Sequence, residues 1–533
     1  MKDLEVYRRC SVRHASPDGN MSYTAVSPRN STPRVGMDEL SGDAMRNFSD
    51  TRSVARNLLG ACGNSCLNVA HPQRISQSET CGADPLCIRE SFMSDVIFQP
   101  LGFRNLSVKN RVFRSNISGR FDNYDGSGSQ ARINWELKFA RGGVGAIISS
   151  FVPVHPRGRI IPNYATIDRD ERIPFWRALG KAVHDHDCKY ILQLSHGGRQ
   201  RDIPDLEYPK GQSSTNKKDP LHGFECDRMT IADIKDVVGA FAEGARRARD
   251  AGLDGVELHG ANGYLITQFL SSAINDRTDE YGGPLQNRAR FVLDIVRAIR
   301  TRVGRDFHLQ MKISAADHNN ALALLKHEGP GNTVEESAQV CKWLVEAGVD
   351  AIHVSTGSSF PHPRNPAGAD LDVGMLSHTY EQLASSGTNT FRNLLLFHNA
   401  LTAELFRKQW VEAGVPKDQI EGLTLPDART IKQAVSVPVI CTGGFQTASV
   451  IRKAISDGDC DGVSIARPLV ANNDLVKQFA AGRDRADKPC TYCNKCLVHV
   501  VEHPIGCYEE SRFPSTEAML REVMSVFQPP AFQ

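Results

Sequence analysis

The chain has 533 residues, 23% of them charged and 40% hydrophobic, and its 63 Lys and Arg residues are nearly balanced by 61 Asp and Glu residues. This balance argues against a strongly basic surface of the kind that binds nucleic acid. No uninterrupted apolar run approaches the roughly 18 residues of a membrane-spanning helix, so a membrane is not an expected partner either.

The first 92 residues differ in composition from all that follows. They are rich in Ser, Asn, Arg and Asp and lack apolar periodicity, which predicts a largely disordered N-terminal tail. The chain begins MKDLEVYRRC, a start without the apolar stretch of a signal peptide. Fourteen cysteines in a chain of this length are too sparse for a disulfide scaffold, so we expect a reduced, cytoplasmic protein.

From about Phe98 onward the sequence alternates between short apolar runs and amphipathic helical patterns. Several runs are apolar on both faces, as is typical of parallel strands that are covered by helices. Eight such strands are predicted, at 111–117, 144–149, 190–194, 255–258, 307–313, 351–354, 437–441 and 462–466.

The helical patterns between these strands end at glycines, as in IADIKDVVGAFAEGARRARDAG and RARFVLDIVRAIRTRVG. Eight strands alternating with helices predict an α/β fold of the (β/α)8 (TIM) barrel type, which we assign to residues 93–485. A doubly wound open sheet is the alternative. No Gly-x-Gly-x-x-Gly sequence follows a strand, so a Rossmann dinucleotide domain is not indicated.

One connection is much longer than the others. After the sixth strand, an insertion of about 357–425 precedes the next regular helix, and it contains one predicted helix, RNLLLFHNALTAELFRKQWVEAG. Because it leaves the C-terminal end of the barrel, it could form a lid, the contact surface of a homo-oligomer, or a simple surface decoration.

The fourth strand ends in a polar cluster, ELHGANGYL, which contains His259, Asn262 and Tyr264. The C-terminal ends of barrel strands are where (β/α)8 enzymes carry their catalytic groups. A strand end with satisfied polar residues is the simpler interpretation of His259 taken alone.

Several motifs, each at a strand end and in the same order, resemble the Old Yellow Enzyme family of NADH:flavin oxidoreductases. They are VKNRVF, QLSHGGRQ, HGANGYLITQFL, MKIS, CTGGF and SIARPLV, and the resemblance covers roughly 97–507. It implies a barrel that holds FMN non-covalently at its C-terminal end and takes electrons from NAD(P)H.

The resemblance assigns three residues to the flavin ring. Gln193 matches a glutamine that hydrogen-bonds the polar edge of the ring, and Ser118 matches a position, usually Thr, near its O4 and N5 atoms. Lys312 matches a position that is usually Arg, so the cation near N1 and O2 is kept without its bidentate geometry.

The phosphate of FMN needs backbone N–H groups that can approach closely, which favours glycine after a strand. Gly443 and Gly444 follow the seventh strand, and Ala466 and Arg467 follow the eighth. These are the two loops at which (β/α)8 barrels bind phosphate.

For catalysis the resemblance implies hydride transfer from flavin N5 to an activated alkene, a small-molecule substrate. His259 and Asn262 would donate hydrogen bonds to the substrate carbonyl or nitro oxygen, and Tyr264 would protonate the α carbon. His196 is interpreted as a loop-holding residue rather than a substrate ligand. His362 lies one residue away from the place of a second catalytic group in dienoyl-CoA reductase-like relatives.

The C-terminal segment, 486–533, contains four cysteines in the spacing C-x2-C-x2-C-x10-C. This pattern suits a [4Fe–4S] cluster, and it resembles the family branch of trimethylamine dehydrogenase and 2,4-dienoyl-CoA reductase. Zinc is an alternative metal for four thiolates, and a motif without any metal is a third interpretation. The residues are Cys490, Cys493, Cys496 and Cys507.

Three functions follow from these observations. The leading hypothesis is an FMN-dependent ene or enoate reductase that NAD(P)H reduces directly. The second is an iron–sulfur flavoprotein of the dienoyl-CoA reductase or amine dehydrogenase type that exchanges electrons with an outside carrier. An outside carrier is expected there because the sequence stops some 26 residues after Cys507 and leaves no room for the downstream domains of those relatives. The third, a non-catalytic barrel, is disfavoured by the intact cluster around His259.

Overall fold

The computed structural model describes residues 95–200, 208–319, 328–368, 370–384, 387–500 and 503–528. The predicted disordered tail at 1–92 lies outside these residues.

Eight parallel strands form a closed barrel. Each strand pairs with the next barrel strand along the chain, and the last, β13, pairs with the first, β3. All eight predicted strands are therefore confirmed, with bounds that differ by a few residues, and the open-sheet alternative is wrong. The barrel strands are β3 (Val112–Arg114), β4 (Ala146–Ile148), β6 (Lys189–Ser195), β9 (Gly255–Gly260), β10 (His308–Ser314), β11 (Ala351–Ser355), β12 (Val439–Thr442) and β13 (Gly462–Ile465).

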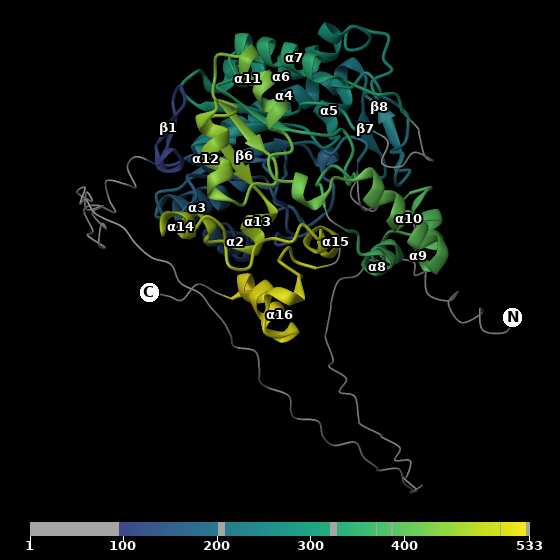
Figure 1. Cartoon of the computed structure of the whole chain (residues 1–533). Coiled ribbons are helices and arrows are strands. Elements are labelled where there is room, and N and C mark those ends of the chain that lie inside the picture. Colours follow the sequence, from purple (N-terminus) through teal and green to yellow (C-terminus); the bar gives the residue numbers. More distant parts are fainter. Residues whose placement is uncertain are drawn as a thin grey trace, which may run out of the picture. The chain divides into compact units, whose positions relative to one another are not determined.

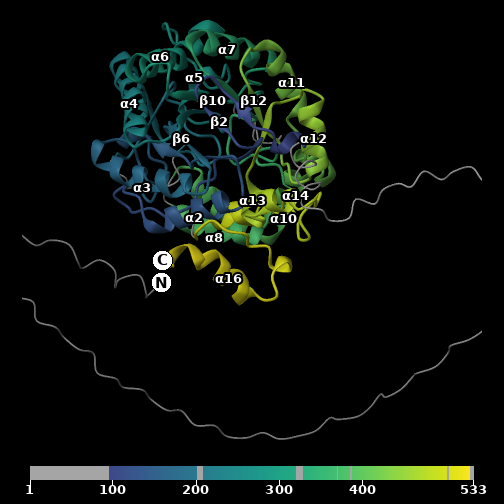
Figure 2. The same cartoon turned by 90° about the vertical axis from the view of Figure 1, so that its left-hand side faces the viewer.

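A layer of helices covers the outside of this barrel. Every residue of β9 and β10 is buried, although polar and apolar residues alternate along both strands (GVELHG and HLQMKIS). The alternate polar residues of neighbouring strands, such as Glu257 and Gln310, meet in a buried network. In Figure 2, β6, β10 and β12 lie inside a ring of helices. The covering helices are α2 (Gln130–Arg141), α3 (Ile173–His184), α4 (Ile231–Asp250), α6 (Leu285–Val303), α7 (Val334–Ala347), α11 (Leu425–Ala434) and α12 (Ala448–Ser456).

Local signals fix the ends of these helices. Thr230 and Asp233 form a capping box at the start of α4. The glycines predicted to end α4 and α6, Gly252 and Gly304, both have positive φ, a conformation that glycine adopts without strain.

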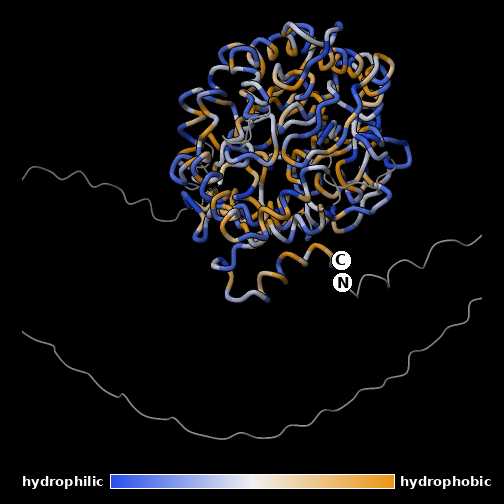
Figure 3. Tube along the Cα trace, turned by 90° about the vertical axis from the view of Figure 1, so that its right-hand side faces the viewer, coloured by the Kyte–Doolittle hydropathy of each residue, from blue (hydrophilic) through white to orange (hydrophobic). Residues whose placement is uncertain are grey.

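Shorter elements complete the described chain. They are the antiparallel pair β1 (Leu101–Gly102) and β2 (Ser107–Val108), the strand β5 (Val152–Pro153) beside β6, the pair β7 (Gly211–Ser213) and β8 (Cys226–Arg228), and the helices α5 (Leu265–Leu270), α13 (Arg467–Ala471), α14 (Leu475–Ala480), α15 (Lys495–His499) and α16 (Thr516–Met524). Hydrophobic and hydrophilic stretches alternate along the trace in Figure 3. Across the described residues, no helix has the length and apolar character needed to cross a bilayer.

The insertion after β11 folds into α8 (Val373–Leu383), α9 (Thr390–His398) and α10 (Ala400–Ala413). The single helix predicted across 392–414 is wrong, because Asn399 is extended and its side chain accepts hydrogen bonds from the N–H groups of Leu401 and Thr402. Asn at this position is an N-cap, which starts a new helix rather than continuing the old one. The three helices lie together in Figure 1, and α8 contacts α15 of the cysteine segment.

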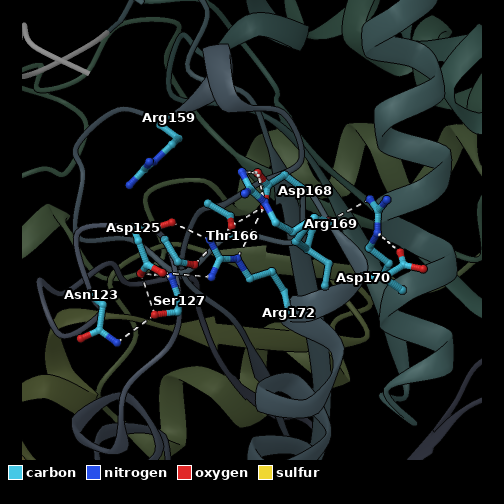
Figure 4. A network of polar contacts seen from close by, with 12 residues as sticks. Asn123, Asp125, Ser127, Arg159, Thr166, Asp168, Arg169, Asp170 and Arg172 are labelled. Atoms are coloured by element: carbon cyan, nitrogen blue, oxygen red, sulfur yellow. Dashed lines mark hydrogen bonds and ion pairs between the residues drawn. The ribbon is translucent and has the colours of Figure 1, made fainter. Parts of the chain in front are cut away.

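On another side of the barrel mouth, a polar network ties the loop after β3 to the segment that precedes α3 (Figure 4). Arg172 donates to the backbone oxygen of Asp125 at 2.5 Å, and Thr166 donates to Asp168 at 2.6 Å. Arg159 reaches the backbone oxygen of Tyr124 at 2.6 Å. The network fixes two loops that contribute side chains to the cavity described next.

Candidate active site

A cavity of about 310 Å³ lies at the C-terminal end of the barrel strands. It is lined by strand ends and loops of the barrel, by the insertion and by the cysteine segment. Eight of the residues predicted from sequence line it: Ser118, His259, Asn262, Tyr264, Lys312, Ala466, Arg467 and Cys496.

His259, Asn262 and Tyr264 meet in this cavity. The Tyr264 ring packs edge-on against both the His259 ring and the Phe151 ring, with centroids 4.8 Å apart in each case. Asn262 has a φ of 61°, and Gln200 donates to its backbone oxygen at 2.7 Å, so the turn after β9 is held from a second loop. The side-chain oxygen of Asn262 is buried and has no partner among the described residues.

His259 is a neutral imidazole in this setting. Burial lowers its pKa well below the usual value, and the nearby positive charge of Lys312 lowers it further. Its Nδ1 atom is buried and has no hydrogen-bond partner in the described part of the chain. A neutral ring with one unengaged nitrogen is suited to hydrogen bonding with a ligand rather than to carrying a charge.

Lys312 lies next to His259 in the β9–β10 register and is only 4% exposed. Its ammonium donates to the side-chain oxygen of Asn116. Burial lowers the pKa of Lys312 to about 8, against the opposing effect of the Glu257 carboxylate. The cavity therefore contains a buried cation whose charge is lost just above neutral pH. The sequence did not predict Asn116 as a site residue. The unusual sequence RSNIS after the first strand was the signal that could have identified it.

One layer deeper, Glu257 is the centre of a buried polar network. It accepts from Gln193 at 2.7 Å, from His353 at 2.8 Å and from Gln310. Burial alone would raise the pKa of Glu257, but His353, Lys312 and the hydrogen bond from Gln310 lower it to about 2. Sequence reasoning missed this network, although a charged residue inside the apolar run GVELHG was a signal for it.

Gln193 does not line the cavity; it is fully buried beneath it. Because its amide nitrogen donates to Glu257, its carbonyl oxygen is the atom without a partner among the described residues. An orphaned acceptor at this depth fits an N–H donor such as the N3–H of a flavin ring.

The two predicted phosphate loops differ in how they reach the cavity. Ala466 and Arg467 line it, whereas Gly443 and Gly444 are not among its lining residues. Gly444 has a φ of 72°, and a Cβ atom there would lie 2.8 Å from the backbone oxygen of Ile420. Glycine is thus required at this turn, because the Ile420 backbone leaves no room for a Cβ atom there. Taken together, the buried cation Lys312 and the orphaned acceptor of Gln193 fit FMN, whereas the turn at Gly444 is explained by the Ile420 backbone.

Two histidines considered from the sequence lie elsewhere. His196 accepts a hydrogen bond from the Gly198 N–H and is not among the cavity-lining residues, and His362 accepts from the Arg364 N–H. Both geometries are those of side chains that hold a local turn.

The four cysteines of the C-terminal segment line a second, much smaller cavity of about 20 Å³. Arg467, Asn494 and Cys496 line both cavities, so the cysteines adjoin the main one. Burial raises the pKa values of Cys490, Cys496 and Cys507, which favours protonated thiols in the absence of a metal. Within the described ranges, no set of three or more His, Cys, Asp or Glu side chains is arranged to hold a metal ion. The donor set suits iron–sulfur or zinc, and its ligation stays a prediction.

Comparison with known proteins places this geometry in context. The model of the NADH:flavin oxidoreductase / NADH oxidase family matches residues 96–385. The chain is 30% identical to the NADH oxidase of Thermoanaerobacter brockii over 421 residues, which are 76% of this chain and 56% of that protein. It is 28% identical to the cinnamate reductase of Clostridium sporogenes over 414 residues, 75% of this chain and 55% of that protein.

The fold is also similar to that of a solved 2-naphthoyl-CoA reductase in complex with 2-naphthoyl-CoA. The TM-score is 0.63 at 24% sequence identity, over 78% of this chain and 56% of that chain. The chain thus spans about half the length of these relatives.

Proposed function

Because the chain belongs to the NADH:flavin oxidoreductase / NADH oxidase family, we propose that it is an FMN-dependent oxidoreductase that uses NAD(P)H to reduce an activated C=C bond. The observation that carries this proposal is the meeting of His259, Asn262 and Tyr264 with the buried cation Lys312 in one cavity at the barrel mouth. The proposal includes the division into a barrel (93–485) and a cysteine segment (486–533).

FMN held in this cavity would supply the hydride chemistry that couples NAD(P)H to reduction of the alkene at its β carbon. Lys312 would stabilise the negative charge of the reduced ring at its N1 and O2 edge, and Gln193 would accept a hydrogen bond from N3–H. The loops that carry Gly443, Gly444 and Arg467 would hold the phosphate, and Ser118 would lie near the O4 and N5 edge.

The substrate would be held by the polar cluster after β9. His259 and Asn262 would each donate a hydrogen bond to the substrate oxygen, which gains charge as the alkene is reduced. Tyr264, whose ring is fixed between Phe151 and His259, would deliver a proton to the α carbon. The Phe151 ring also forms part of the cavity wall beside Tyr264.

Separate measurement of the two half-reactions tests this assignment. In anaerobic stopped-flow experiments, Tyr264→Phe should leave flavin reduction by NADPH intact and slow flavin reoxidation by an enone about 100-fold or more. Tyr281→Phe is the matched control, because the Tyr281 hydroxyl bonds Asp294 and Tyr281 does not line the cavity. Equal loss in both half-reactions would contradict the proton-donor role. Failure of the protein to bind FMN would contradict the proposal as a whole.

We propose as a second candidate an iron–sulfur flavoprotein that exchanges electrons with an outside carrier. It is supported by the four cysteines that line one small cavity and by the residues this cavity shares with the main one. A [4Fe–4S] cluster bound there would adjoin the flavin cavity.

Metal analysis of anaerobically purified protein separates the alternatives. A visible absorption shoulder that dithionite bleaches, together with iron that is lost in Cys493→Ala and kept in Cys341→Ala, would support the cluster; Cys341 lies buried in α7. Zinc in place of iron would identify a structural site, and protein free of both metals would leave direct reduction by NAD(P)H as the electron route.

A further inference from the structure

We infer that the part of the cavity enclosed by the insertion is a chamber for an uncharged, apolar tail of the substrate. The substrate class is an α,β-unsaturated ketone or similar carbonyl compound with a tail of several carbon atoms. This inference rests on the proposed function, because it extends the same cavity away from the catalytic cluster.

The chamber is continuous with the catalytic cluster. The same cavity that contains His259 and Tyr264 extends to side chains of all three insertion helices. The lining side chains from these helices are Leu376, Tyr380 and Leu383 of α8, Phe397 of α9, and Phe406 and Trp410 of α10.

Four of these side chains form an unbroken aromatic wall. Tyr380 stacks on Phe397 with ring centroids 5.2 Å apart, Phe397 meets Phe406 edge-on at 4.9 Å, and Phe406 stacks near Trp410 at 5.8 Å. Tyr380, Phe397 and Trp410 are each less than 8% exposed. Rings that are fixed against one another present a rigid apolar surface, which binds apolar groups with little loss of side-chain entropy.

The charge distribution in the cavity decides the nature of the tail. Among the described residues that line it, there is no Asp or Glu, and Lys312 and Arg467 are the Lys and Arg residues present. Both of these cations lie at barrel strand ends and are engaged there, by Asn116 and by Asn494 at 2.5 Å respectively. His222 also lines the cavity, 5.9 Å from Tyr380 between ring centroids, and it is paired with Asp219 at 3.3 Å. A charged tail would therefore lose its hydration in the chamber without gaining an unpaired opposite charge, whereas an alkyl or aryl tail gains by burial.

A series of methyl ketones with one reactive group and different tails tests the chamber. (E)-3-Penten-2-one and (E)-3-decen-2-one share the conjugated carbonyl and differ by five methylenes. At roughly fourfold per buried methylene, burial of half the longer tail predicts a kcat/KM about 30-fold higher for the decenone. 8-Oxonon-6-enoate, whose tail ends in a carboxylate, should lose this advantage.

Two variants locate the effect. Leu376→Glu places a charge on the half-buried chamber wall and should lower kcat/KM for the decenone at least about tenfold more than for the pentenone. Leu401→Glu is the matched control, because Leu401 lies on α10, is 70% exposed and does not line the cavity, so both activities should stay unchanged. If circular dichroism shows that Leu376→Glu is misfolded, Phe406→Ser replaces it with the same expectation.

A binding measurement separates failure of the chamber from failure of the proposed function. Isothermal titration calorimetry with the saturated ketones 2-pentanone and 2-decanone requires no turnover. Tighter binding of 2-decanone that is lost in Leu376→Glu supports the chamber even if no enone is reduced. Equal binding of the two ketones, or equal kcat/KM for the two enones, overturns it.

Discussion

Replacing Glu257 by Gln tests the polar network beneath the cavity. The pKa of Glu257 is about 2 rather than 4.5, and this shift corresponds to about 3 kcal/mol of stabilisation at pH 7. Because the folded-state pKa is depressed, the contribution is fully present above pH 4.5 and is lost as the pH falls from 4.5 through about 2. A glutamine amide would also turn a donor toward Gln193, Gln310 or His353, each of which now donates to the carboxylate.

Urea unfolding of the wild type and Glu257→Gln at pH 7 and pH 3 provides the assay. The loss of unfolding free energy in Glu257→Gln should be about 2 kcal/mol larger at pH 7 than at pH 3, where much of the carboxylate contribution has already been lost. The misplaced amide donor adds a loss that is the same at both pH values. Glu412→Gln, at an exposed position, should change it by less than about 0.5 kcal/mol at either pH. An equally large loss at both pH values would refute the electrostatic argument and leave only a packing defect.

Three further predictions concern the cofactor region. Since the pKa of Lys312 is about 8, the cation is present below this pH and lost above it. The reduction potential of bound FMN should therefore fall more steeply with pH above 8. A spectroelectrochemical titration should show that Lys312→Arg removes this change of slope. Asn116→Ala removes the acceptor of the Lys312 ammonium and should raise the FMN dissociation constant roughly tenfold in a fluorescence titration. Gly444→Ala should lower the free energy of unfolding by about 1–3 kcal/mol more than Gly458→Ala, because both glycines have positive φ but only at Gly444 would the new Cβ meet the backbone of Ile420.

The barrel could be predicted because its signals are local. Each parallel strand is a short run rich in apolar residues with glycine, aspartate or proline near its ends, and side-chain caps begin the covering helices α2, α4 and α7, so all eight strands were found without any knowledge of their pairing. The helix break at Asn399 was equally local, since Asn is a strong N-cap residue, but the apolar periodicity on both sides concealed it. The sequence predicted neither helix α8 nor the chamber. The apolar side chains of α8 face the cavity rather than a neighbouring strand.

The polar network could not be predicted because its partners meet only through the strand register. Gln193 and Gln310 are each aligned with Glu257 on its two neighbouring strands, although they lie more than fifty residues away in the sequence. Strand pairing between β6, β9 and β10 therefore assembles a layer that no window of the sequence contains. The cluster His259, Asn262 and Tyr264 was visible because a single turn holds all three.

The position of Lys312 in the strand register also affects which residue can donate the proton in the proposed reaction. Lys312 is aligned with both His259 and His353, one layer above the carboxylate of Glu257. Its positive charge and the burial of His259 both disfavour an imidazolium, so His259 is restricted to hydrogen bonding over the working pH range. On the proposed mechanism, a cation beside His259 thus has two effects: it stabilises the reduced ring, and it leaves delivery of the proton to Tyr264. Substrate choice is then decided elsewhere, by the apolar wall that the insertion adds to the same cavity.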